Sequence, residues 1–203
     1  MIGDPMPSTV GHAIAGVAAA WAVDAVPGRR AWRAASPHAS WFQKAGGGLT
    51  LFCAAIAAAP DLDLLFHLHR TYSHSIGAVL LAALVAAAIA ASRHRPAVRI
   101  ASMCALAYAT HLFLDWLSVD HLPPYGLQAL WPFTDRWFIS GWDVFRQTER
   151  RRFLSRESIE INMLAIAQEI AILLPIAVAI WLIRVKSLAG LSAQVARDDH
   201  PPK

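Results

Sequence analysis

Long apolar runs separated by short polar segments dominate the pattern of this 203-residue chain. A helix that crosses a bilayer needs roughly 20 apolar residues, with a range of about 17 to 25. Three runs meet this requirement, and two more are marginal; in chain order the five are 11–26 (marginal), 46–60 (marginal), 74–91, 97–117 and 161–183. No segment is rich in strand-forming residues. The pattern therefore predicts an all-α fold, a multi-pass transmembrane bundle of four to five helices.

The longest polar interval, 118–160, is too rich in aromatic residues to be a disordered linker. It contains Trp131, Trp137 and Trp142, and tryptophan is enriched where a membrane protein meets the lipid headgroups. We therefore expect this interval to form an ordered interfacial layer. The pattern predicts one membrane-embedded domain over 1–186 and a polar tail over 187–203.

Composition supports a membrane protein, because 56% of the residues are hydrophobic and only 16% are charged. Soluble domains contain about 25% charged residues. The formal net charge is +4, but the basic residues form short clusters between apolar runs, as membrane loops do. We therefore expect contact with membrane lipids and no nucleic-acid partner. Cys53 and Cys104 lie inside apolar runs, which excludes a thiolate metal site, and the N-terminus lacks the basic segment of a cleaved signal.

The distribution of basic residues predicts an orientation. If the helices alternate in direction, the loops 27–45 and 92–99 and the C-terminus share one face, which carries most of the 18 basic residues. The positive-inside rule places that face on the cytoplasmic side of the membrane. The basic run 150–152 on the other face opposes this preference.

Histidine and carboxylate side chains gather at the other face, at the ends of all five predicted helices. An isolated ionisable group there is costly and usually marks a functional site. We therefore predict a divalent-metal site where the bilayer meets water, and imidazole plus carboxylate without thiolate suits zinc or manganese. The candidates in chain order are His12, Asp61, Asp63, His69, His74, His111, Asp115, Glu157 and Glu160.

Local spacing supports this prediction. His111 and Asp115 are four residues apart and lie on one helical face. An extended Asp61-Leu62-Asp63 segment would direct both carboxylates the same way. His69 and His74 converge only if the intervening residues turn, and Ser73 is a suitable N-cap for the third helix. Considered singly, a histidine such as His12 at a helix end is more often an interfacial hydrogen-bonding residue than a ligand, and the two aspartates can simply form a helix-ending turn.

Five segments in order, "PSTVGH", "PDLD", "HRTYSHS", "HLFLD" and "YGLQALWPFTDRWF", resemble the YdjM-like family of predicted inner-membrane, metal-dependent hydrolases over residues 7–183. The resemblance implies a multi-pass inner-membrane protein with a hydrolytic metal site. A more distant similarity is to zinc-dependent phospholipase C. In those enzymes a further histidine follows the aspartate by six residues, which makes His121 either a ligand or a loop residue here, and a later glutamate completes the site, for which Glu160 is preferred to Glu157.

These observations predict a hydrolase in which a metal activates water against a phosphoester or acyl centre of a lipid-linked substrate. We expect His74, His111, Asp115 and Asp61 to bind the metal, with His12 completing that site or holding a second metal. Asp63 or Glu160 is the expected proton acceptor. Arg70 either binds a phosphate, anchors a headgroup or pairs with Asp63.

The alternative is a non-enzymatic cation or proton transporter, or a scaffold, that uses the same cluster. Glu169, inside the last apolar run, favours this alternative, because a carboxylate within a membrane span can mark a pathway. It can equally hydrogen-bond to a neighbouring helix.

Overall fold

A computed structural model describes residues 7–26, 40–66, 70–120, 123–149 and 154–198. The described chain is helical, and its only β-pairing consists of two isolated bridges, so the predicted all-α class is confirmed. The helices are α1 (Thr9–Ala25), α2 (Trp41–Lys44), α3 (Gly47–Ala58), the 3-10 helices η2 (Ala59–Phe66) and η3 (Tyr72–His74), α4 (Ile76–Ser92), α5 (Ala97–Leu117) and α6 (Arg156–Asp198).

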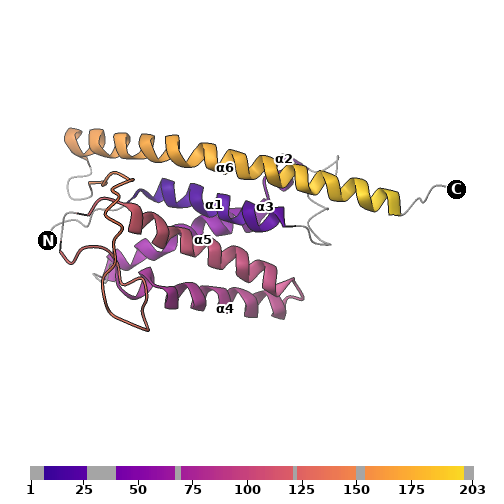
Figure 1. Cartoon of the computed structure of the whole chain (residues 1–203), viewed down its shortest axis with the longest axis horizontal. Coiled ribbons are helices and arrows are strands. Elements are labelled where there is room, and N and C mark those ends of the chain that lie inside the picture. The colour runs from indigo at the N-terminus through magenta and orange to yellow at the C-terminus, as the bar shows by residue number, and fades with distance from the viewer. Residues whose placement is uncertain (1–6, 27–39, 67–69, 121–122, 150–153, 199–203) are drawn as a thin grey trace.

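The five long helices lie side by side along the longest axis of the molecule (Figure 1). α1 packs against α3, α5 and α6, and α4 packs on the far side of α5. Successive helices alternate in direction. The start of α1, the end of α3, the starts of α4 and α6 and the end of α5 therefore meet at one end of the bundle, which we call the site end (Figure 1).

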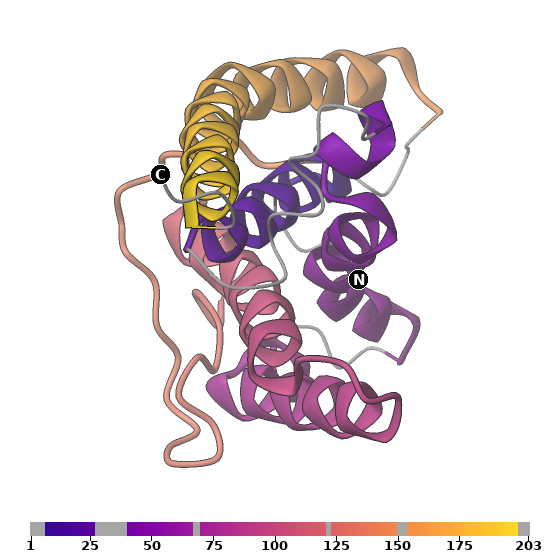
Figure 2. The same cartoon turned by 90° about the vertical axis from the view of Figure 1, so that its right-hand side faces the viewer.

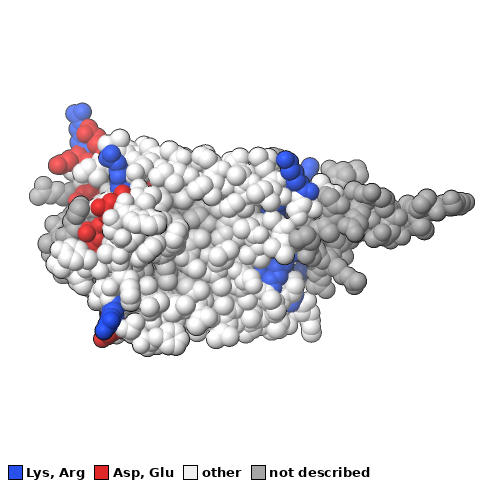
Figure 3. Space-filling view, viewed as in Figure 1, with Lys and Arg blue, Asp and Glu red and all other residues white. Residues whose placement is uncertain are grey.

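The dimensions and surface suit a bilayer. Within the described residues, three helical stretches are long and apolar enough to span it, Gly47–Leu64, Ala97–Leu117 and Arg156–Ala189. α1 and α4, with 17 residues each, are at the lower end of the spanning range. On the face shown in Figure 3, charged side chains occupy the two ends and an uncharged band separates them.

Two predicted boundaries change for local reasons, and a third changes because α6 continues as a helix to Asp198, through most of the predicted polar tail. The third apolar run becomes helical at Ile76 rather than at position 74, because Ser75, and not Ser73, is the N-cap and accepts a hydrogen bond from Ala78 N. The marginal second run becomes one of the three long stretches, because α3 continues without a break into η2.

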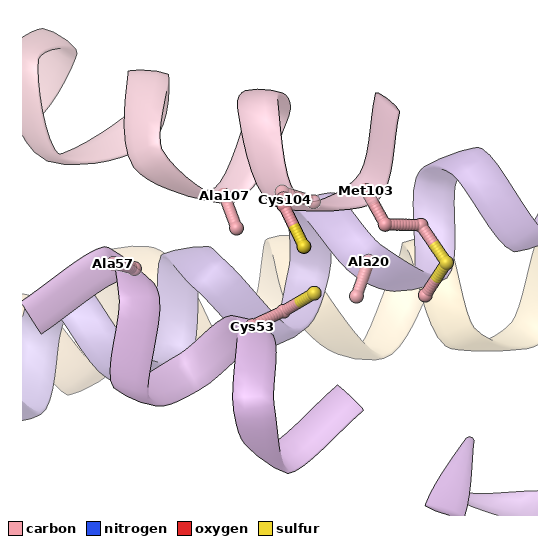
Figure 4. Packing of buried hydrophobic residues seen from close by; sticks show 7 residues of the cluster. Ala20, Cys53, Ala57, Met103, Cys104 and Ala107 are labelled. Carbon is pink, nitrogen blue, oxygen red and sulfur yellow. The ribbon is translucent and has the colours of Figure 1, made fainter. Parts of the chain in front are cut away.

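Small side chains allow the helices to approach closely. Ala20 of α1, Cys53 and Ala57 of α3 and Cys104 and Ala107 of α5 are fully buried and face one another (Figure 4). Without a hydrophobic driving force between helices in lipid, such close packing contributes much of the association energy. Apart from Met103, the buried side chains of this cluster are no larger than cysteine, and the close approach of α1, α3 and α5 depends on them.

A buried ion-pair network joins helices at the end opposite the site end. Arg184 of α6 is 1% exposed and donates to Asp24 of α1 at 3.0 and 3.1 Å and to the carbonyl of Lys44 at 2.6 Å. Arg99 at the start of α5 also donates to Asp24. One carboxylate thus ties α1, α5 and α6 together, and breaking a buried pair of this kind is strongly destabilising.

The closest helix approach gives a test of this packing. A Cβ atom on Gly16 would lie 2.5 Å from Ala57 Cβ and 2.7 Å from the Cys53 carbonyl oxygen. We expect Gly16→Ala to destabilise the protein by about 1–3 kcal/mol through overpacking. The measurement is thermal unfolding in detergent, with Gly48→Ala as the control, because a Cβ there meets nothing within 4 Å. Equal melting temperatures for the two variants would contradict the tight contact.

Candidate metal centre

Four elements place histidine and aspartate side chains at the site end. His12 comes from the first turns of α1, Asp61 from η2, His74 from η3, and His111 and Asp115 from the last turns of α5. These four elements meet because successive helices alternate in direction. The histidines are completely buried and Asp115 is 1% exposed. The structure therefore brings five of the predicted ligands into one cluster, which we call the His/Asp cluster.

Four atoms of this cluster have the spacing of ligands around one cation. His74 Nε2 and His111 Nε2 are 3.0 Å apart. Asp115 Oδ2 lies 3.3 and 3.2 Å from these two nitrogens, and Asp61 Oδ1 lies 3.8 and 3.4 Å from them. Ligands about 2.0–2.1 Å from a tetrahedral zinc ion lie about 3.3–3.4 Å from one another. These five separations therefore lie within about 0.4 Å of those in a tetrahedral site.

The outer nitrogens of two imidazoles are held by oxygen acceptors. His111 Nδ1 lies 2.7 Å from the carbonyl oxygen of Ala57, and His74 Nδ1 lies 3.0 Å from Asp63 Oδ2. A proton on each Nδ1 directs the lone pair of Nε2 into the cluster. This arrangement is typical of metal-binding histidine, in which the outer partner fixes the tautomer and the ring orientation.

His12 and Asp115 fit a cation for a second reason. Both ring nitrogens of His12 and both carboxylate oxygens of Asp115 are buried without a hydrogen-bond partner among the described residues. His12 Nε2 lies 3.4 Å from Asp115 Oδ1, and its ring stacks on His111 with centroids 3.8 Å apart. Buried polar atoms are normally hydrogen-bonded. A cation beside Asp115 would supply the missing interaction.

The charges in the cluster also balance for a divalent ion. Asp61 and Asp115 carry two negative charges, and three neutral histidines add none. Burial by itself lowers the pKa of His74, but the neighbouring carboxylates Asp61, Asp63 and Asp115 raise it to about 9. The bare cluster thus retains a proton that a cation would displace on binding. The donor set fits zinc, or manganese as a harder alternative.

The family follows from the whole chain rather than from the cluster alone. The model of the YdjM inner membrane protein family matches residues 6–191, which is most of the chain. The chain belongs to this family. No curated protein and no solved structure matches it.

In this YdjM family member the two aspartates of the "PDLD" segment act on different sides of His74. The segment is a 3-10 helix, so the expectation of an extended conformation is wrong. With three residues per turn, positions two apart are about 240° apart around the axis. Asp61 therefore reaches Nε2 of His74 while Asp63 reaches Nδ1, and Asp63 also accepts a hydrogen bond from Ser73.

Arg70 has a partner that the sequence analysis missed. Its guanidinium donates to Asp120, whose Oδ2 also accepts from Gly126 N at 2.6 Å, and the Arg70 carbonyl accepts from Gln128 N at 3.0 Å. The ion pair with Asp63 that the sequence suggested is thus replaced by one with Asp120, 50 positions away. No sequence spacing indicates this pair. The one signal that could have suggested a partner for Arg70 is the carboxylate that precedes the "PPYG" turn.

The aromatic segment after α5 is fixed onto the start of α4. The carbonyls of Ala129 and Trp131 accept hydrogen bonds from Ile76 N and Gly77 N at 2.8 and 2.9 Å. A Cβ on Gly77 would lie 2.9 Å from the Trp131 ring, so glycine lets the ring lie against the helix. The "GLQALWPF" segment therefore holds the α4 start that follows His74.

The structure does not bring the predicted glutamates to the His/Asp cluster. Glu160 pairs with Arg156 at 2.9 Å, and its side chain is 61% exposed; Glu157 is also exposed. His69 and His121 lie outside the described residues. Glu169, at the site end of α6, is fully buried and accepts hydrogen bonds from both the amide and the hydroxyl of Ser8, the N-cap of α1.

The contact between Asp63 and His74 gives a test of the centre. We expect Asp63→Asn to weaken zinc binding about 10–100-fold, because loss of the outer carboxylate leaves the His74 ring less basic and less well oriented. Competition between the purified protein and a chelator measures this affinity. Glu160→Gln, an exposed carboxylate change at the same end, should bind zinc like the wild type. Equal zinc affinities for the two variants would show that Asp63 does not contribute to the metal centre.

Proposed function

We propose that this protein is a membrane-bound, metal-dependent hydrolase that cleaves a phosphoester or another ester bond. The observation that carries the proposal is the four-atom arrangement of His74, His111, Asp61 and Asp115, with both imidazoles oriented from behind. A divalent cation bound there would polarise the ester oxygen and acidify a water molecule. Zinc is the proposed ion and manganese the alternative, with His12 either completing the site or holding a second ion.

Residues around the proposed metal would control access of substrate, accept a proton and bind a phosphate. Asp61 and Asp63 keep 10% and 9% of their side-chain area exposed, so substrate and water would enter past η2. Of the two carboxylates proposed to accept a proton, only Asp63 touches the cluster. Arg70 remains the proposed phosphate-binding group, and its bond to Asp120 fixes where its guanidinium lies.

A lipid-linked or headgroup substrate suits the position of the cluster. The site end is where the uncharged band of the surface gives way to charged side chains (Figure 3). Aromatic residues lie there too, with Trp116 and Trp142 rings 6.0 Å apart and Trp142 71% exposed. An ester group at the membrane surface would therefore be at the depth of the cluster.

The transporter alternative is less well supported. Transport requires polar groups through the full depth of the membrane. In the described chain the His/Asp cluster and the Asp24 network lie at opposite ends, and the apolar contacts of Cys53, Met103 and Cys104 lie between them. Glu169, which favoured transport, caps α1 through Ser8 at the site end.

Activity tests the proposal directly. We expect zinc-loaded protein to hydrolyse phosphodiester substrates presented in phospholipid vesicles, and a chelator to abolish the activity. His111→Ala should lower the rate at least about 100-fold, because metal polarisation contributes several kcal/mol to transition-state stabilisation. Glu160→Gln is the matched control and should retain activity. Equal rates for wild type and His111→Ala, or tight zinc binding without hydrolysis of any ester, would contradict the proposal.

We also propose that the site end faces away from the cytoplasm. Exposed Arg93 and Arg95 lie at the opposite end, where the positive-inside rule places the cytoplasm. A membrane-impermeant maleimide should label Arg136→Cys in intact cells and Ser92→Cys only after permeabilisation. Cys53 and Cys104 are buried and should not react. The reverse labelling pattern would invert the orientation.

A further inference from the structure

A groove runs along the surface of the bundle on one side of α5. α3 and α4 each pack on α5 rather than on each other, and Figure 2 shows them diverging from it. The groove encloses a cavity of about 480 Å³, within the range of about 300–1,000 Å³ that ligand pockets occupy. Its walls include Phe52 and Ile56 of α3 and Leu81, Val85 and Ile89 of α4. These side chains are hydrocarbon or aromatic, so the groove suits an apolar chain.

The groove is long. Along α4 it extends from Ala78 to Arg93, which corresponds to about 22 Å at 1.5 Å per residue. This exceeds half of a hydrocarbon core of about 30 Å. An extended acyl chain that enters at the Arg93 end would therefore lie in the groove over most of its length.

One end of the groove carries positive charge. Arg93 and Arg95 both line it and are exposed, and neither has a carboxylate partner among the described residues. Arg99 and Arg184 at the same end are different, because both are paired with Asp24. The two unpaired guanidinium groups can therefore bind an external anion, and guanidinium matches the geometry of a phosphate.

We propose that this groove binds an anionic phospholipid, with its phosphate at Arg93 and Arg95 and one acyl chain between α3 and α4. The two arginines and the apolar wall follow one another along the groove in the same order as the phosphate and the acyl chain of such a lipid. The far end of the acyl chain would reach Ala78 and Tyr108. This site lies apart from the His/Asp cluster and does not depend on the proposed hydrolysis.

Native mass spectrometry can test the proposal. Purified full-length protein in micelles with equal amounts of phosphatidylglycerol and phosphatidylcholine should retain one phosphatidylglycerol molecule per chain. Ala82→Trp should lose it, because Ala82 lines the groove and a large ring would fill it. Ala88→Trp, on the exposed surface of the same helix outside the groove, should retain it. Unchanged helical content by circular dichroism establishes that each variant is folded.

The arginines have a separate test. In Arg93→Gln/Arg95→Gln the preference for phosphatidylglycerol over phosphatidylcholine should fall roughly thirtyfold, given the contribution of each basic residue near an anionic lipid. Arg136→Gln, at the site end, should leave the preference unchanged. Lipid retention by Ala82→Trp, an unchanged preference in the double variant, or a second copy cross-linked in the groove through Val85→Cys would each overturn the proposal.

Discussion

The buried carboxylate of Asp115 sets the strongest constraint on this molecule. It is 1% exposed, and three imidazole nitrogens, of His12, His74 and His111, lie 3.2 to 3.4 Å from its oxygens. A buried charge without compensation costs several kcal/mol. The cation proposed to lie between Asp115 and Asp61 would offset both charges while the histidines stay neutral. To hold such an ion, the helix ends must meet closely enough for it to contact several of them.

The fold meets this requirement by controlling the distances between helices at two levels. Small residues where α1, α3 and α5 meet bring the helix axes together, and Gly16 allows the closest of these approaches. At the end opposite the cluster, Asp24 joins α1, α5 and α6 through two arginines. Since α1 and α5 carry His12, His111 and Asp115, these contacts join the same helices that bring the donors of the cluster together.

The sequence was sufficient to predict the helices and the convergence, because both follow from apolar run length and alternating direction. Finer geometry was not predictable. Ser73 and Ser75 both satisfy the rule for an N-cap, and the choice depends on Asp63 taking the Ser73 hydroxyl. The pairing of Arg70 with Asp120 depends on how the loop after α5 folds back. The groove between α3 and α4 depends on how both helices pack on α5, which no apolar run length encodes.

One path of hydrogen bonds connects the wall of the groove with the His/Asp cluster. Tyr108 lines the groove and donates from its hydroxyl to the carbonyl of Ser73 at 2.7 Å. The Ser73 hydroxyl donates to Asp63, and Asp63 orients His74 through Nδ1. Because Ser73 takes part in both hydrogen bonds, the residue that Tyr108 holds is also the one that positions Asp63 behind His74. The membrane-facing surface and the buried centre are therefore parts of one arrangement of α5, η2 and η3.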